Sequence, residues 1–346
     1  MKLSIVIICW NDRKVIDDCL RSIYKETHDI DFEILVSDNG STDGSIEFIR
    51  NKYPRVRIIE NRANLGFAKG NNAGIFQSSG QYVLILNPDT IIQDHALEKL
   101  VAFADGHPGA GGFGCRVLNR DGSYQGPARP FPSAFRDLLA ALYLRSLARL
   151  SDLFISDTYT GWNGDSERLV DWQSGCCVMF RAHLLKQLGG FDDQFFYHFE
   201  EVDLCRRVWN AGYTVIYTPE AVITHLGGQS VNRFPVRFEL EKCRSRYKYF
   251  YKHFGPRGAR RCRHIFLTRV RIRQFGWSIL GMFSSRDVLK NRLKMYRVTV
   301  AWNKQLDAVR FVERGDEPEV VENTAVQSSA TFTLVSRSAK CEERKP

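Results

Sequence analysis

Short apolar runs alternate with helix-spaced apolar positions along roughly the first 90 residues. Each short run is bounded by turn-forming residues, a pattern that predicts a buried strand. The predicted strands cover residues 3–9, 32–36, 56–59 and 82–86. Helices are expected between them, near residues 15–24, from 45 onward and at 67–77. This order predicts an α/β fold with a mostly parallel central sheet flanked by helices.

The chain after this part is less regular. Further strands are expected at residues 111–117, 176–180, 214–217 and 221–224. Further helices are expected at 137–155, where leucines alternate with arginines, and at 200–210. From Gly315 onward the chain is polar and then rich in Ser and Thr, which is typical of disorder. We therefore expect a domain at 1–230, a basic, aromatic helical extension at 231–312 and a tail at 313–346.

The positive charge is concentrated in the extension. The whole chain carries a net charge of +10, but residues 242–297 hold 17 Lys or Arg and one acid, Asp287, so the remainder is −6. Such a segment favours a polyanionic partner: an anionic membrane surface, a nucleic acid or a phosphorylated lipid. We expect it to dock on a membrane; helices that pack on the domain are the alternative.

The nine cysteines form no C-x-x-C pair, and several lie inside apolar runs. This pattern favours buried free thiols in a reducing compartment, and we expect a cytoplasmic protein. The apolar run at 3–10 is short and is interrupted by polar residues 11–14, so we interpret it as a strand, not a signal peptide. No stretch of 18 apolar residues exists, and no transmembrane helix is expected.

Carboxylates follow two of the predicted strands. Asp89 comes after Pro88 at the end of the strand at 82–86, and Asp38 ends the second strand. Open α/β sheets bind ligands outside the carboxyl ends of their strands, so both could face a site. Ordinary turn chemistry is the alternative, because Asp, Asn and Gly are common turn formers.

Two other clusters could carry chemistry. Residues 61–74 are rich in Gly and Asn at a helix entry, where backbone N–H groups can approach an anion, although the P-loop pattern is absent. Glu200, Glu201 and Asp203 place three carboxylates within four residues, directly after an apolar run at 195–199. We interpret them as the wall of a pocket; a solvated helix start is the alternative.

His225 ends a predicted short strand. A lone histidine is more often a structural hydrogen-bond partner than a ligand. Together with Asp89 it could form a carboxylate–imidazole site that suits Mn²⁺ or Mg²⁺, with open positions for phosphate.

Several short motifs follow one another along the chain, and together they are specific enough to indicate a protein family. They are residues 4–7 (SIVI), 36–45 (VSDNGSTDGS), 64–72 (NLGFAKGNN), 86–89 (LNPD), 171–175 (DWQSG), 189–192 (GGFD), 200–204 (EEVDL) and 225–228 (HLGG). Over roughly residues 3–230 the chain resembles family 2 glycosyltransferases of the GT-A fold. Within that family it is similar to bacterial rhamnosyltransferases.

The resemblance implies a role for each matching residue. Asp38 corresponds to the residue that reads the donor's base, and the other expected donor contacts are Asn64, Gly66, Lys69, Asn72 and Asn87. Asp89 and His225 correspond to the metal site, although Asn87 stands where many relatives have an acid. Glu201 corresponds to the general base, one methylene longer than the usual Asp, with Asp203 in reserve. The acceptor pocket is expected at Trp172, Gly175 and Glu200.

The resemblance also implies a reaction. The donor would be a dTDP- or UDP-linked sugar, with dTDP-rhamnose favoured, and transfer would invert the anomeric centre with the help of Mn²⁺ or Mg²⁺. The acceptor would be a glycan or lipid-linked glycan of the bacterial cell surface, reached from the inner face of the plasma membrane.

Three rival interpretations remain. A nucleic-acid-binding protein would explain the Arg-rich segment, but the acidic remainder disfavours it, and no nucleic acid is expected. A catalytically silent sugar-nucleotide-binding module would share the same motifs. A sugar nucleotidyltransferase would need a Gly-rich basic loop after the first strand, where this chain has Trp10-Asn11-Asp12-Arg13.

Overall fold

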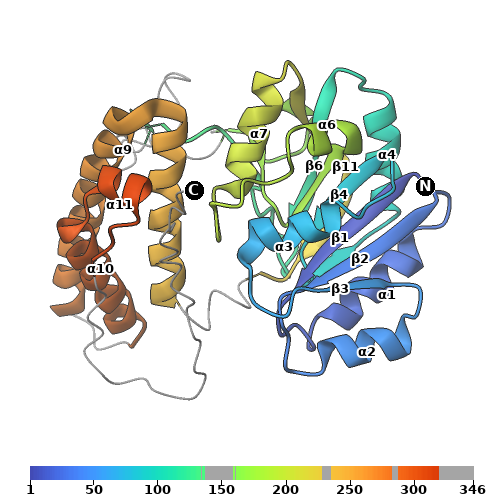
Figure 1. Cartoon of the computed structure of the whole chain (residues 1–346), viewed down its shortest axis with the longest axis horizontal. Helices are drawn as coiled ribbons and strands as arrows, with labels where there is room; N and C mark the ends of the chain where they lie inside the picture. The colour runs from blue at the N-terminus through green and yellow to red at the C-terminus, as the bar shows by residue number, and fades with distance from the viewer. Residues whose placement is uncertain (134, 137–158, 160, 228–234, 283–286, 319–346) are drawn as a thin grey trace, which may run out of the picture.

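The computed structural model describes residues 1–133, 135–136, 159, 161–227, 235–282 and 287–318 of the chain. An α/β domain holds the N-terminal part, and a bundle of helices lies beside it (Figure 1). The strands are β1 Leu3–Cys9, β2 Phe32–Asp38, β3 Arg57–Glu60, β4 Tyr82–Leu86, β5 Thr90–Ile92, β6 Ala110–Leu118, β7 Ala128–Arg129, β8 Arg168–Leu169, β9 Trp172–Gln173, β10 Cys177–Arg181 and β11 Thr214–His225. The helices are α1 Ile16–Glu26, α2 Ser45–Lys52, α3 Gly66–Ile75, α4 Ala96–Asp105, α6 Ala182–Gln187, α7 Glu200–Asn210, α9 Pro235–Met282, α10 Asp287–Gln305 and α11 Ala308–Arg314.

The central sheet is mixed and has nine strands. Its order is β3-β2-β1-β4-β10-β6-β11-β5, and β8 pairs with β11 off this path. The four strands β3, β2, β1 and β4 run parallel to one another, as the alternation of strands and helices predicts. The antiparallel β10 joins this parallel half to β6, which pairs in parallel with β11.

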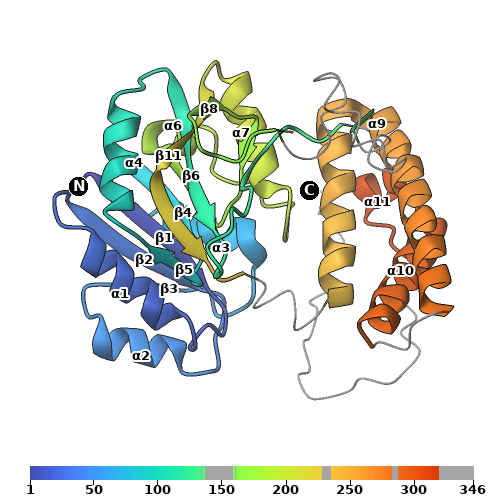
Figure 2. The ribbon, with the colours of Figure 1, turned by 180° about the vertical axis from the view of Figure 1, so that it is seen from behind.

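Helices cover both faces of the sheet (Figure 2). The alternation of side chains along β1 explains this arrangement. Leu3, Ile5 and Ile7 point into the core beneath α1, α2 and α4, whereas Val6 points into the core beneath α3, α6 and α7. Successive side chains of a strand face opposite sides, so a strand buried on both faces is apolar throughout. All five residues of β4 are buried for the same reason.

The C-terminal helices form a bundle that packs on the α/β domain through α7. The core of the bundle includes Tyr247 and Trp302, whose rings stack with centroids 6.4 Å apart, and it is continuous with the core on the α7 side of the sheet. The long helix α9 bends at Gly255, whose φ of 68° lies in the left-handed region. Within the described part of the chain, no helix has the length and apolar character needed to cross a membrane.

Most of the predicted elements are confirmed, and one prediction is wrong. The expected strands at 214–217 and 221–224 are a single strand, β11, whose pairing with β6 shifts register between Thr218 and Val222. Pro219 lies inside that irregularity, so the proline marks a bulge and not the end of a strand. The helix expected at 137–155 and residues 319–346 of the expected tail lie outside the described residues. The eight described cysteines are all buried and free.

Candidate functional site

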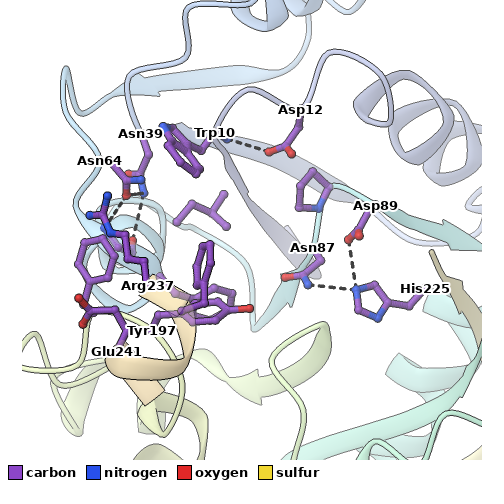
Figure 3. A pocket seen from close by; sticks show the side chains of 16 residues that line it. Trp10, Asp12, Asn39, Asn64, Asn87, Asp89, Tyr197, His225, Arg237 and Glu241 are labelled. Atoms are coloured by element: carbon purple, nitrogen blue, oxygen red, sulfur yellow. Dashed lines mark hydrogen bonds and ion pairs between the residues drawn. The ribbon is translucent and has the colours of Figure 1, made fainter. Parts of the chain in front are cut away.

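A pocket lies at the carboxyl edge of the parallel strands, as the fold predicts. Trp10 and Asp12 follow β1, Asn39 follows β2, and Asn87 and Asp89 follow β4 (Figure 3). We call this the strand-end pocket. It is lined by Ile8, Trp10, Asp12, Asn39, Asn64, Gly66, Phe67, Asn87, Pro88, Asp89, Phe196, Tyr197, His225, Arg237, Phe238 and Glu241.

Asp89 and His225 meet in this pocket. Oδ1 of Asp89 lies 3.2 Å from Nε2 of His225, and Nδ2 of Asn87 lies 3.3 Å from the same ring nitrogen. Asp89 is 8% exposed, so its carboxylate is largely withdrawn from solvent. The contact depends on the sheet, because β5 pairs with β11 and aligns Thr90 with His225.

The orientation of the His225 ring is set by Gln125. Nδ1 of His225 lies 2.8 Å from Oε1 of Gln125, whose own amide nitrogen donates to Oδ1 of Asn119 at 2.9 Å. This network assigns the proton of a neutral imidazole to Nδ1 and leaves the lone pair of Nε2 facing Asp89. A carboxylate oxygen and a ring lone pair on one side of a pocket are a suitable pair of ligands for a divalent cation.

The residues present therefore fit Mn²⁺ or Mg²⁺, with Asp89 and His225 as ligands and open positions left over. Among the described residues, no cluster of three or more His, Cys, Asp or Glu side chains could hold a metal. A cation held by this pair would need oxygen ligands from elsewhere, and the phosphates of a bound ligand or water could supply them.

The Asn- and Gly-rich segment forms another wall of the pocket. Oδ1 of Asn64 accepts a hydrogen bond from the N–H of Gly66 at 3.0 Å, and Asn39 donates to the carbonyl of Gly66 at 3.1 Å. Gly66 has a φ of +80°, and a Cβ there would lie 2.4 Å from the carbonyl oxygen of Phe196. Only glycine fits at this position, since both the backbone conformation and the space exclude a side chain.

Three other predicted donor contacts do not line this pocket. Asp38 is buried, and its carboxylate accepts from the N–H groups of Gly40 and Ser41 at 3.2 and 2.9 Å, which is turn chemistry. The amide of Asn72 holds Phe191, accepting from its N–H at 2.9 Å and donating to its carbonyl at 2.8 Å. Lys69 is exposed on α3.

The acidic residues at the start of α7 follow shortly after Tyr197 in the chain. Tyr197 lines the strand-end pocket, and the following His198 and Phe199 have φ angles of +65° and +71°. Left-handed conformations are costly for residues other than glycine and cluster at functional sites. These two residues turn the chain so that Glu200 and Glu201 begin a helix facing inward; they are 3% and 8% exposed.

The acidity of these two side chains is unusual. Burial raises the pKa of Glu201 to about 7. Burial, followed by repulsion from Glu201, raises the pKa of Glu200 well above its ordinary value. Burial raises the pKa of Tyr197 too, as do the charges of Glu200, Glu201 and Asp89. A carboxylate with a pKa near neutrality is suited to general base catalysis.

Glu201 lines a second pocket, which we call the cationic pocket. Its lining consists of Gln125, Gly126, Pro127, Arg129, Pro130, Phe131, Pro132, Ser133, Arg136, Trp172, Ser174, His198, Phe199, Glu201, Val202, Lys242, Arg246 and Arg269. Of the predicted acceptor residues, Trp172 lines this pocket and donates to the carbonyl of Pro130 at 2.9 Å. Gly175 sits between the pockets, since a Cβ there would lie 3.0 Å from Phe67 and 3.9 Å from Glu201.

Asp203 has different surroundings from Glu201 and lines neither pocket. Its carboxylate is fully buried and lies 2.7 Å from Arg207, 2.8 Å from Lys252 and 2.8 Å from His253. Burial alone would raise the pKa of Asp203, but the hydrogen bond from His253 and the charges of Arg207 and Lys252 lower it to about 2. This carboxylate joins α7 to α9.

Comparison with known proteins identifies the family. Residues 4–189 match the family model described as Glycosyl transferase family 2. The chain belongs to glycosyl transferase family 2. This family 2 enzyme is 32% identical over 218 residues to the N-acetylglucosaminyl-diphospho-decaprenol L-rhamnosyltransferase of Mycobacterium tuberculosis, an alignment that covers 58% of the chain and 69% of that protein.

More distant relatives agree with the fold. The low-salt glycan biosynthesis hexosyltransferase Agl10 of Haloferax volcanii is 26% identical over 211 residues, 59% of this chain and 61% of that protein. Among solved structures, the mannosyltransferase PcManGT from Pyrobaculum calidifontis, in complex with GDP-Man and Mn²⁺, superposes with a TM-score of 0.51 at 15% identity. That alignment covers 88% of each chain, so the GT-A-like fold of this glycosyltransferase extends into the helical part.

The structure adds residues that the sequence did not single out. Arg237 and Glu241 of α9 line the strand-end pocket, and Lys242, Arg246 and Arg269 of α9 line the cationic pocket. The extension of this glycosyltransferase thus contributes to both pockets. The polar residues directly after β1 were the one available signal for Trp10 and Asp12, since they follow a strand end in the same way as Asp89. No local pattern marks Gln125 or the inward face of α9.

Proposed function

We propose that this chain is an inverting, metal-dependent glycosyltransferase that moves a sugar from a nucleotide diphospho-sugar to a hydroxyl of a lipid-linked glycan. One observation carries the proposal. The Asp89–His225 pair lines the strand-end pocket and the buried Glu201 lines the cationic pocket, and Gly175 lies between Phe67 of the first pocket and Glu201 of the second. This arrangement supports a diphosphate site beside a general base.

The strand-end pocket would hold the donor. Asp89 and His225 would bind the cation, and Gln125 would keep Nε2 of His225 aimed at it. A divalent cation there supplies positive charge against the departing diphosphate. We still propose that Asp38 helps to bind the nucleobase of the donor. It would do so indirectly, by stabilising the turn that contains Asn39. The side chains of Asn64, Asn87 and Arg237 would contact the nucleotide or sugar.

Glu201 would act on the acceptor. Its ionised carboxylate would take the proton of the attacking hydroxyl as that oxygen forms a bond to the anomeric carbon. The bond from the anomeric carbon to the diphosphate oxygen would break, and its electron pair would leave with the nucleoside diphosphate. Attack from the face opposite the leaving group inverts the anomeric configuration. Glu200 and Trp172 would shape the acceptor side.

The relatives guide the choice of substrates. The Mycobacterium tuberculosis relative is named for L-rhamnose transfer and an N-acetylglucosaminyl-diphospho-decaprenol acceptor, and we propose dTDP-rhamnose and a polyprenyl-diphosphate-linked glycan here. Other relatives act on poly(ribitol-phosphate), again a cell-surface polymer. Such an acceptor would place the enzyme at the cytoplasmic face of the plasma membrane, where exposed arginines of α9 could contact anionic lipid.

A donor screen tests the function. We expect one dTDP- or UDP-linked sugar to give nucleoside diphosphate and a glycosylated acceptor in the presence of Mn²⁺ or Mg²⁺. Donor binding without product would instead indicate a catalytically silent module. Failure of every nucleotide diphospho-sugar to bind would refute the proposal.

A further inference from the structure

The charged residues that line the cationic pocket are mainly cations. Among its described lining residues, five are cations and one, Glu201, is an acid: the cations are Arg129, Arg136, Lys242, Arg246 and Arg269. They come from distant parts of the sequence: Arg129 ends β7 and Arg136 follows it, whereas Lys242 and Arg246 precede the bend of α9 at Gly255 and Arg269 follows that bend. Because like charges repel, such a group of cations is favourable only where each has a compensating contact or where an anion enters the pocket.

Contacts within the protein already orient the side chains of Arg129 and Arg136. Arg129 donates to the carbonyl of Gly126 at 3.3 Å and lies over the ring of Trp172, 5.9 Å from its centroid. Arg136 lies 3.8 Å from Asp171, so part of its charge is balanced. Lys242 forms no hydrogen bond or ion pair with another described residue. Its ammonium group is therefore available to a ligand without breaking a contact to the described part of the chain.

The pKa of His198 indicates positive charge inside the pocket. Burial, together with the charges of Lys242, Arg129 and Arg246, lowers the pKa of His198 to about 3. The neutral imidazole means that the pocket resists an additional positive charge. Beside these cations lie apolar side chains of Pro130, Phe131 and other residues. The pocket thus suits a ligand that carries both phosphate and an apolar chain.

We propose that the cationic pocket binds the diphosphate of a polyprenyl-diphosphate-linked acceptor and so presents its sugar hydroxyl to Glu201. The inference rests on the proposed function and assigns its acceptor site. The two diphosphates would then bind in different pockets. The diphosphate of the donor would lie in the strand-end pocket beside Asp89, and that of the acceptor would lie in the cationic pocket beside Lys242. Gln125, which contacts His225 and lines the cationic pocket, lies between them.

Binding of farnesyl diphosphate to the full chain, in detergent and excess EDTA, tests this directly. We expect Lys242→Gln and Arg129→Gln each to weaken binding about tenfold, because each removes one charged contact to phosphate. Lys304→Gln, the same change at an exposed position of α10, should bind like wild type. Circular dichroism and thermal unfolding would confirm that each variant is folded. Equal affinity of wild type and both pocket variants, or equal binding of farnesol, would overturn the inference.

Two further arms separate the alternatives. Asp89→Asn should bind farnesyl diphosphate normally in EDTA; a large loss would place this ligand in the strand-end pocket and overturn the inference. Vesicles containing phosphatidylglycerol should bind Lys242→Gln as well as wild type, whereas an equal loss for vesicles and farnesyl diphosphate would assign the pocket to lipid headgroups. Donor binding is measured separately, so its failure would refute the proposed function and leave this result standing.

Discussion

The carboxylate of Asp89 and the imidazole of His225 lie 3.2 Å apart, where the turn between β4 and β5 meets the end of β11. Asp89 is buried and His225 is half-buried, and the lone pair of the histidine faces the acid because Gln125 holds the other ring nitrogen at 2.8 Å. Two electron-rich atoms held this way can supply two of the ligands of a cation site. The remaining ligands would arrive with the donor.

Gln125 is predicted to act as a positioning residue. Gln125→Ala should raise the Mn²⁺ concentration needed for half-maximal transfer by about 10–100-fold, because the His225 ring loses its orienting partner. The maximal rate at saturating Mn²⁺ should change little. Activity titrated against Mn²⁺ gives both quantities. A loss that excess Mn²⁺ does not restore would show that Gln125 has a different role.

Glu201 is predicted to be the general base. Glu201→Gln should lower kcat by about 10²–10⁴-fold while leaving donor binding unchanged. Since the pKa of Glu201 is raised to about 7, wild-type kcat should fall about tenfold per pH unit below that value as the base becomes protonated. The same change at the exposed Glu47 of α2 is the matched control. A wild-type rate in Glu201→Gln would exclude the role.

The same substitution should stabilise the fold at alkaline pH. A carboxyl group whose pKa is higher in the folded chain binds more protons when folded, so its contribution to stability is lost as pH rises through about 4.5 to 7. Glu201→Gln removes this penalty and should increase the free energy of unfolding by about 1–3 kcal/mol at pH 8, but not at pH 4.5. Denaturant unfolding at the two pH values checks this, and equal stability at pH 8 would contradict it.

Asp203 is predicted to matter for stability more than for chemistry. Asp203→Asn leaves Arg207, Lys252 and His253 without their shared carboxylate and should cost about 3–5 kcal/mol. Because the folded pKa of Asp203 is about 2, roughly 2 kcal/mol of stability present above pH 4 should disappear as pH falls toward 2. Denaturant unfolding measures both. A folded Asp203→Asn with normal stability and no activity would make Asp203 the base instead.

The exposed face of α9 is predicted to bind anionic membranes. Arg257, Arg260 and Arg261 are exposed, and so is Phe275, at 70%. The full chain should bind phosphatidylglycerol vesicles at low salt and not phosphatidylcholine vesicles. Replacing the three arginines by Gln should weaken binding about 10²-fold, since each contributes about 1 kcal/mol. Sedimentation that fails to detect vesicle binding at low salt would end this proposal.

The sequence predicted the parallel half of the sheet because its strands are buried on both faces and their apolar runs end at turn residues. The position of Asp89 followed from the same pattern, as Pro88 ends the strand run. The role of Asp203 could not follow, since Lys252 and His253 reach it from a helix some 50 residues further along the chain. Spacing within α7 does not distinguish a carboxylate that faces cations from one that faces a pocket.

The sequence shows that the extension is positively charged, but it does not show which way the charged side chains face. Composition alone favoured a membrane surface for the whole segment from Lys242 onward. In the structure, Lys242, Arg246 and Arg269 turn toward the α/β domain, while Arg257 and Arg261 remain exposed. The element against which a helix packs decides which of its faces turns inward. For α9 that element is α7 together with the loop before it, and the sequence of α9 alone does not identify it.

The most direct test of the account is sugar transfer from dTDP-rhamnose to N-acetylglucosaminyl-diphospho-farnesol, followed by mass spectrometry of the product, with wild type and Asp89→Asn compared in Mn²⁺ and in EDTA. The account predicts product from wild type in Mn²⁺, and a rate lower by about 10²-fold or more in EDTA or with Asp89→Asn. Exposed Asp29→Asn should behave like wild type. Full transfer by Asp89→Asn, or by wild type in excess EDTA, would contradict the claim that this pocket holds a metal-bound donor.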